Sequence, residues 1–212
     1  MRAKSRKKNT GIFKNYRYVI GIDEAGRGPI AGPVSVGAVL VPVSFDFSFM
    51  DGVRDSKQCT EAAREVWYEK TLALAREGEV RFASALLGPA RIDARGINAA
   101  ITLGVRRVLA RFAVPPEECK ILLDGLLHAP GIFKFQETII RGDETEPIIS
   151  LASIVAKVRR DRYMKRLALR YPNYAFEQHK GYGTKLHYER IEKYGLSEVH
   201  RKTFVKDLHV VS

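Results

Sequence analysis

The sequence YVIGIDEAGRGPIAGP, residues 18–33, combines an apolar run with acidic residues and a glycine-rich turn. Its apolar first half ends on two adjacent carboxylates, Asp23 and Glu24, and a glycine-flanked arginine, Arg27, follows closely. Buried strands are normally apolar, so a strand that finishes in Asp-Glu places two charges where they need partners. A cation is the expected partner of the carboxylates, and a polyanion is the expected partner of the arginine. The stretch therefore predicts a metal site beside a surface for nucleic acid.

The charge of the chain supports a polyanionic partner. Its 212 residues carry 36 Lys and Arg against 24 Asp and Glu, a formal net charge of +12. Residues 1–17 hold seven basic residues and no acidic one, and residues 157–206 hold fourteen basic residues against five acidic ones. The rest of the chain is slightly acidic, so the basic surface is expected at the two ends of the sequence. The alternative interpretation is a generally solubilising surface.

Two cysteines, Cys59 and Cys119, have neither metal-ligand spacing nor the pattern of a disulfide framework, which fits a reducing compartment. The longest apolar stretch, residues 29–43, is short and is interrupted by Gly, Pro and Ser. The apolar part of the basic N-terminus is too brief for a signal peptide. These features predict a cytoplasmic protein with no membrane segment.

The apolar patterns predict an α/β protein with a mixed central sheet flanked by helices. Strands cluster early in the chain, and strand–helix alternation follows. Strands are expected at 18–23, 34–43, 80–87, 120–124 and 135–141, helices at 60–76, 92–113, 148–170 and 186–194, and a turn-rich loop at 142–147.

We expect three parts along the chain. Residues 1–17 form a basic arm that is disordered by composition. Residues 18–172 contain all the predicted strands and form one catalytic domain. Residues 173–212 form a small helical extension that binds substrate.

Carboxylates at the ends of two strands carry the predicted chemistry. Asp23 and Asp124 each finish an apolar strand, and ligands of open α/β sheets gather at the carboxyl ends of strands. Asp161 lies on the same face of the long predicted helix as Lys157, four residues earlier. If that face covers the strand ends, four carboxylates converge there. The predicted ligands are Asp23, Glu24, Asp124 and Asp161.

Four carboxylates without imidazole or thiolate suit a hard ion such as Mg²⁺ or Mn²⁺. Two such ions, about 3.5–4 Å apart, activate a water and stabilise the leaving oxygen in phosphodiester cleavage. Taken singly, each aspartate has a plainer interpretation. Asp at a strand end is often a turn residue, and Lys157 with Asp161 is often an exposed helical pair. The plainer interpretation poorly explains two strands that both end in Asp.

Two glycine-containing segments have competing interpretations. Gly26-x-Gly28-x-x-Ala31 formally fits a dinucleotide fingerprint, but a helix must begin there, and prolines and a β-type run follow instead. A tight loop whose amides approach the phosphates or sugars of a duplex is the better account. In the sequence Gly-Tyr182-Gly-Thr184-Lys, the tyrosine ring could stack on a sugar or base, or simply pack on a turn.

Six motifs, taken in chain order, resemble those of the type 2 ribonucleases H, specifically the bacterial ribonuclease HII family. They are GIDEAGRGPIAGPV at 21–34, DSK at 55–57, LLDG at 122–125, ASIVAKVRRDRYM at 152–164, HKGYGT at 179–184 and HRKTF at 200–204. Together they cover the chain from residue 18 to residue 204. The motif at 21–34 followed by the one at 152–164 is very specific for the family, whereas DSK alone is a weak signal.

The resemblance implies a ribonuclease H-like fold with a helical C-terminal extension. It implies endonucleolytic cleavage of the RNA strand of RNA–DNA hybrids, and a nick 5′ of a single ribonucleotide in duplex DNA. The products are 3′-hydroxyl and 5′-phosphate ends, and the cofactor is Mn²⁺ or Mg²⁺ bound as two ions.

The resemblance also assigns substrate contacts. The backbone of Gly26, Arg27 and Gly28 grips the ribose 2′-hydroxyl, and the arginine binds the adjacent phosphate. Tyr182 stacks at the RNA–DNA junction. A protein that distinguishes RNA from DNA must read the 2′-hydroxyl somewhere, so these roles are physically sensible. Further expected contacts to phosphate are Lys57, Lys157, Lys180 and Thr184.

Two other functions compete with this one. A non-catalytic basic protein that binds hybrids or duplex DNA does not need all four carboxylates, and all four are present. A junction resolvase on the same fold does not need the two glycine-flanked segments. We expect a monomer, and a replication or repair protein is left open as a further partner.

Overall fold

The structure is a computed structural model that describes residues 16–46, 48 and 60–205. The basic arm predicted for 1–17 therefore falls almost entirely outside the described residues, as do Lys57 and Cys59. Within the described ranges, no helix has the length and apolar character needed to cross a membrane.

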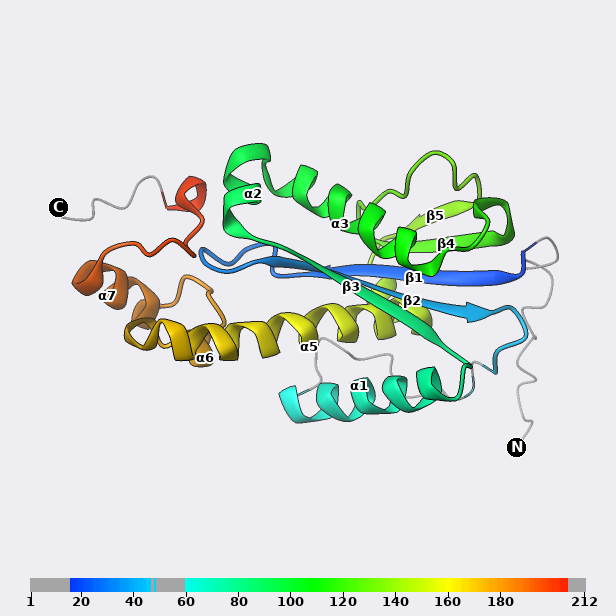
Figure 1. The fold of residues 1–212 in the computed structure, drawn as a ribbon, viewed down its shortest axis with the longest axis horizontal. Helices are drawn as coiled ribbons and strands as arrows, with labels where there is room; N and C mark the ends of the chain where they lie inside the picture. Colours follow the sequence, from blue (N-terminus) through cyan, green and yellow to red (C-terminus); the bar gives the residue numbers. More distant parts are fainter. Residues whose placement is uncertain (1–15, 47, 49–59, 206–212) are drawn as a thin grey trace, which may run out of the picture.

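A five-stranded mixed sheet forms the centre of the molecule, as predicted (Figure 1). The strand order is β3-β2-β1-β4-β5. β1 pairs with β2 antiparallel and with β4 parallel, and β4 pairs with β5 parallel. The strands are β1 (Tyr18–Ala25), β2 (Val34–Pro42), β3 (Arg81–Leu87), β4 (Cys119–Asp124) and β5 (Gln136–Ile139).

Helices cover both faces of this sheet (Figure 1). α3 packs on one face through a core that includes Ile22 and Leu123, and α5 and α1 pack on the other through a core that includes Val19. The helices are α1 (Glu61–Arg76), α2 (Pro89–Arg95), α3 (Ile97–Phe112), α4 (Gly142–Thr145), α5 (Pro147–Arg170), α6 (Phe176–His179) and α7 (Lys185–Tyr194), with 3₁₀ turns at Pro116–Glu118, Pro172–Tyr174 and Lys202–Phe204.

Glycines in the two central strands let α5 lie unusually close to the sheet. A β-carbon on Gly21 would collide with the backbone of Ile148, and one on Gly37 would collide with the backbone of Ala152. Because backbone cannot move aside as a flexible side chain can, larger residues at these positions would push the helix away. This close contact fixes the height of α5 above the carboxylates of β1.

Two predicted elements are wrong in detail. The single helix expected over 92–113 is two helices, α2 and α3, which are separated by Gly96 at φ 80°. The loop expected over 142–147 contains the short helix α4, followed at once by α5. Thr60 caps the start of α1, since its hydroxyl accepts a hydrogen bond from the amide of Ala63 at 3.2 Å.

A third core joins the C-terminal elements to the rest of the protein. It contains Ala31 from the glycine-rich loop after β1, Met164 from α5, and Phe176 and Ile191 from the following helices. An isolated bridge pairs Ala31 with His200. The division of the chain at residue 172 stays a prediction.

Candidate active site

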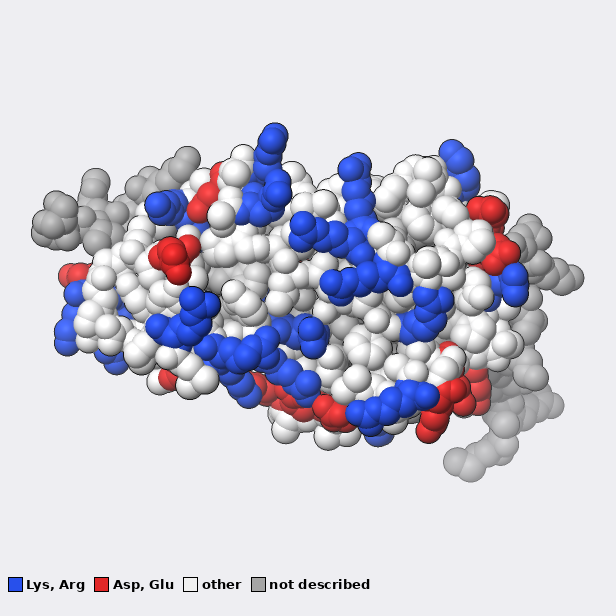
Figure 2. All heavy atoms as spheres, in the orientation of Figure 1, with Lys and Arg blue, Asp and Glu red and all other residues white. Residues whose placement is uncertain are grey.

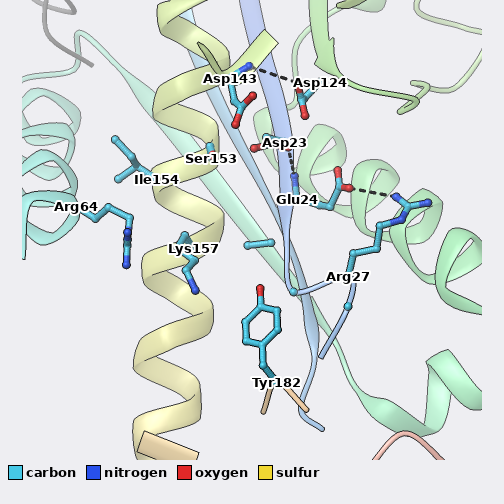
Figure 3. A pocket seen from close by; sticks show the side chains of 13 residues that line it. Asp23, Glu24, Arg27, Arg64, Asp124, Asp143, Ser153, Ile154, Lys157 and Tyr182 are labelled. Carbon is cyan, nitrogen blue, oxygen red and sulfur yellow. Dashed lines mark hydrogen bonds and ion pairs between the residues drawn. The ribbon is translucent and has the colours of Figure 1, made fainter. Parts of the chain in front are cut away.

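The parallel pairing of β1 and β4 brings the two strand-end aspartates together. The register matches Ile22 with Leu123, so the next residues along the strands are Asp23 and Asp124. Both line one cavity (Figure 3), which also contains Glu24. The predicted meeting of these strand ends is what the structure shows.

Consecutive strand residues point to opposite faces, and this separates the two carboxylates of β1. Asp23 is buried at 4% exposure and interacts with Ser153 of α5, while its Oδ1 accepts from the amide of Glu24 at 2.7 Å. Glu24 accepts from Arg27 at 3.1 Å, and Arg27 also donates to Asn98 at the start of α3.

Burial and repulsion destabilise the charged forms of these carboxylates. The pKa of Asp23 is raised well above its ordinary value, first by burial and then by the negative charges of Glu24 and Asp124. Burial also raises the pKa of Glu24, although Arg27 opposes this change. A bound cation would reverse both effects, because it stabilises the ionised forms.

A fourth carboxylate, Asp143, enters the cavity from α4 (Figure 3). Its backbone amide donates to Asp124 Oδ1 at 3.3 Å, and the residue is fully buried. The sequence pattern predicts only a turn-rich loop at 142–147, so Asp143 is not among the predicted site residues. A signal was available: β5 is a third parallel strand, and Asp143 follows its carboxyl end within four residues.

Asp161 does not line this cavity, contrary to the expectation that it joins the other carboxylates. It lies farther along α5, where it accepts from Lys157 at 3.0 Å and pairs with Arg64 of α1 at 3.8 Å. The two cations explain why a carboxylate can be buried there at 3% exposure. The structure therefore brings Asp143, and not Asp161, into the lining of this cavity with the other three carboxylates.

The donor set of the cavity fits a hard divalent cation, since it consists of carboxylates that repel one another and are shielded from water. Across the described part of the chain, no three acidic, imidazole or thiolate side chains already stand in a metal-binding arrangement.

The loop after β1 borders the same cavity, as predicted, with Gly26, Arg27 and Gly28 in its lining. Gly26 has φ 89°, and a β-carbon there would collide with the side chain of buried Arg160. A β-carbon on Gly28 meets no heavy atom within 4 Å. The protein itself thus requires a glycine at position 26 but not at position 28.

Tyr182 also lines the cavity, at 42% exposure, and its ring lies 5.8 Å from the Lys157 ammonium. Imidazoles hold its backbone. His187 Nδ1 lies 2.9 Å from the Tyr182 carbonyl oxygen, so it carries the proton, and its Nε2 then accepts from His200 Nε2 at 3.1 Å. His200 Nδ1 in turn accepts from the Ser197 amide at 2.9 Å.

Burial lowers the pKa of His187 and that of His200 to about 4. Each ring is therefore neutral at pH 7, which this chain of donors and acceptors requires.

The remaining predicted contacts are distributed unevenly. Lys157 lines the cavity. Lys180 does not, and its ammonium lies 3.5 Å from Glu61 of α1. The Thr184 hydroxyl caps α7 by accepting from the His187 amide at 3.3 Å. Lys57 lies outside the described residues.

Carboxylates at parallel strand ends, with a cationic and aromatic rim, on a five-stranded mixed sheet define the class of ribonuclease H-like nucleases. Solved structures share this fold. The ribonuclease HII of Archaeoglobus fulgidus, in a complex with PCNA, gives a TM-score of 0.71 at 22% identity, covering 92% of this chain and 97% of that one. Ribonuclease H2 of Pyrococcus horikoshii OT3 gives 0.66 at 26% identity over 88% and 93%.

The sequence comparisons identify the family. The ribonuclease HII family profile matches residues 20–208. Ribonuclease HII of Bacillus cytotoxicus is 42% identical over 193 residues, which is 90% of this chain and 70% of the relative. That of Caldicellulosiruptor bescii is 39% identical over 197 residues, or 93% and 91%. The chain belongs to the ribonuclease HII family, and its activity is that of an endoribonuclease on RNA–DNA hybrids.

Proposed function

We propose that this protein cleaves the RNA strand of RNA–DNA hybrids and nicks duplex DNA on the 5′ side of a single embedded ribonucleotide, which leaves 3′-hydroxyl and 5′-phosphate ends. The observation that carries the proposal is one cavity that joins four carboxylates to Gly26-Arg27-Gly28 and Tyr182. The carboxylates supply the chemistry, and the other residues select the phosphodiester.

The proposed ligands for the divalent cation are Asp23, Glu24, Asp124 and Asp143. Mg²⁺ or Mn²⁺ is the expected ion, because the donors are all oxygens, and the solved structure of Bst ribonuclease HIII with Mn²⁺ shares the fold at a TM-score of 0.63. When bound, two such ions activate water and stabilise the leaving oxygen of an in-line displacement. The role of Ser153 is to hold Asp23 in place by its hydrogen bond.

Selection of the ribonucleotide rests on the loop at 26–28. The open space beside Gly28 allows the backbone to approach a sugar closely, where its amide can donate to a 2′-hydroxyl. Arg27 is 46% exposed at its side chain and can bind a phosphate while it also pairs with Glu24. Tyr182 is placed to stack on the sugar that follows the ribonucleotide.

Further contacts to phosphate are proposed for four residues. Lys157 can reach a phosphate in the cavity, whereas Lys57, Lys180 and Thr184 stay predictions as phosphate contacts. We further propose that the protein acts as a cytoplasmic monomer. A replication or repair protein is a reasonable additional partner, because the Archaeoglobus fulgidus relative is found in a complex with PCNA.

A labelled DNA duplex with one ribonucleotide tests this function, with an all-DNA duplex of the same sequence as the control. The duplex is incubated with Mg²⁺, with Mn²⁺ and with a chelator. We expect a single nick 5′ of the ribonucleotide with either metal, an end that a polymerase can extend, and no product with the chelator. Cleavage that persists in the chelator, or equal cleavage of the all-DNA duplex, would contradict the proposal. Tight binding without any nick would favour the non-catalytic alternative.

A further inference from the structure

Arg201 is fully buried, in the segment that follows α7, yet it forms no ion pair with any carboxylate in the described part of the chain. A buried guanidinium is costly unless its donors are satisfied. All of the contacts that satisfy it lead to the loop after β1. The guanidinium therefore donates its hydrogen bonds to backbone carbonyls rather than to an acidic side chain.

Three hydrogen bonds join Arg201 to this loop. Its Nη2 donates to the Gly26 carbonyl at 2.7 Å, its Nη1 to the Arg27 carbonyl at 2.9 Å, and its Nε to the Gly32 carbonyl at 3.0 Å. The backbone of the same segment adds a fourth bond, from the Arg201 amide to the Ile30 carbonyl at 2.7 Å. The guanidinium thus grips one side of the loop along its whole length.

The geometry of the peptide bond determines the direction in which the amides of the loop point when Arg201 binds these carbonyls. In a trans peptide, the carbonyl of one residue and the amide of the next point in opposite directions. With the carbonyls of Gly26 and Arg27 turned toward Arg201, the amides of Arg27 and Gly28 point away from it. Neither amide donates to another residue that the structure describes, and both residues line the cavity.

The charge of the guanidinium adds to this orientation. A cation on a carbonyl oxygen polarises the peptide and strengthens its amide as a donor. Burial and the adjacent Arg160 guanidinium lower the pKa of Arg201 to about 9, so the side chain stays charged at neutral pH. A lysine could supply the charge but not three donors in a fixed fork.

We propose that Arg201 is a positioning residue for substrate selection: it aims the amides of Arg27 and Gly28 at the ribonucleotide. The inference rests on the proposed role of this loop in reading the 2′-hydroxyl. It links the C-terminal segment to specificity through the backbone, with no contact between Arg201 and the substrate.

Steady-state cleavage of the single-ribonucleotide duplex by Arg201→Ala and Arg201→Lys tests the proposal. We expect KM to rise about 10- to 100-fold in both, the equivalent of two lost or weakened hydrogen bonds, with kcat nearly unchanged. Ethylguanidinium at millimolar concentration should restore KM in Arg201→Ala, whereas ethylammonium should not. Arg76→Ala, which removes an exposed arginine at the end of α1, serves as the control for charge.

A purely structural role predicts a different pattern: equal loss of kcat and of thermal stability, and no rescue by the guanidinium. That pattern, or unchanged kinetics, would overturn the inference. Gly28→Ala, whose added β-carbon meets no atom of the protein, separates this failure from a failure of the proposed function. If Gly28→Ala does not alter the preference for the ribonucleotide, the loop does not read it. If Gly28→Ala alters the preference and Arg201→Ala does not, only the role of Arg201 is refuted.

Discussion

Substitutions of Gly26 and Gly28 should separate an effect on folding from an effect on substrate selection. Gly26→Ala should destabilise the protein, because φ is 89° and the Arg160 side chain occupies the space of a β-carbon. Gly28→Ala meets no atom, so its unfolding free energy should stay within about 0.5 kcal/mol of the parent. The same variant should nevertheless lose most of its cleavage at a single ribonucleotide. Thermal unfolding and cleavage measured side by side test the pair, and full activity in Gly28→Ala would show that no substrate group approaches there.

Asp23 should lower the stability of the metal-free protein at neutral pH, although the same carboxylate is a proposed ligand for the cation. Its raised pKa means that the folded state holds the proton more tightly than the unfolded chain does. Its contribution to stability therefore falls as the pH rises above the ordinary carboxyl pKa, and it is unfavourable at neutral pH. Without metal, Asp23→Asn should raise the unfolding free energy by about 1 kcal/mol, or the Tm by roughly 2–4 °C.

Added Mg²⁺ or Mn²⁺ should make the parent protein more stable than Asp23→Asn. The parent protein should gain stability with metal concentration, whereas Asp23→Asn should gain little. A metal-free Asp23→Asn that is less stable than the parent would contradict this account of the burial cost.

At the scale of residues, the sequence was most informative where a strand pattern ended in charge. Asp23 and Asp124 could be placed together from strand ends alone. Asp161 lies outside the cavity that Asp143 lines, because helical spacing shows which face a residue lies on but not how far along the helix the cavity extends. Arg201 carried no local signal, since its partners are backbone carbonyls about 170 residues earlier in the chain.

At the scale of elements, propensity and capping placed α1, β2 and α5 within one or two residues. Two boundaries could not be found in this way. Gly96 ends α2 through a positive φ that a helical pattern tolerates in sequence, so α2 and α3 looked continuous. α4 is a single turn, and it is held by its contacts with Asp124 and α5 rather than by its own propensity.

The imidazole pair that holds the Tyr182 backbone should make stability depend on pH. Because the folded pKa values of His187 and His200 are about 4, below the ordinary value near 6.5, the unfolded chain binds more protons between these limits. Their contribution is fully present above about pH 6.5 and is lost as the pH falls toward 4. The loss is about 1.4 kcal/mol per pH unit for each ring.

Urea unfolding between pH 7 and pH 5 measures this dependence. His187→Asn combined with His200→Gln keeps donors near the same positions but removes the titration, so its slope should be shallower. His128→Ala, at an exposed imidazole, is the control and should keep the parent slope. A double variant with the slope of the parent would contradict the assignment.

At the scale of the whole molecule, positive side chains spread over the face shown in Figure 2, and most acidic ones lie toward its edges, notably in a row along α1. Arginine and lysine on α5 compensate part of that acidic row, as in the contact of Arg162 with Glu69 at 2.9 Å. The net charge of +12 is therefore largely uncompensated within the protein and can attract a polyanion.

Binding to nucleic acid should consequently weaken with salt, by about 0.9 in the logarithmic slope for each phosphate contacted. Arg27→Ala should reduce the magnitude of this slope by about 0.9, the value for one phosphate contact, whereas Arg76→Ala should leave the slope unchanged. Binding of a ribonucleotide-containing duplex, measured with a chelator over a range of salt concentrations, gives both slopes. An unaltered slope in Arg27→Ala would show that this arginine does not bind phosphate.

We expect the chemistry of this member of the ribonuclease HII family to depend on the carboxylates that β1, β4 and α4 bring together. The decisive measurement is single-turnover cleavage of the single-ribonucleotide duplex by Asp143→Asn, beside Asp161→Asn. We expect a loss of at least about 100-fold for Asp143→Asn at unchanged fold, since a proposed ligand for the cation is removed. Asp161→Asn should lose stability, from its broken pairs with Lys157 and Arg64, more than it loses rate. Parent-like cleavage by Asp143→Asn, with abolished cleavage by a folded Asp161→Asn, would contradict the claim.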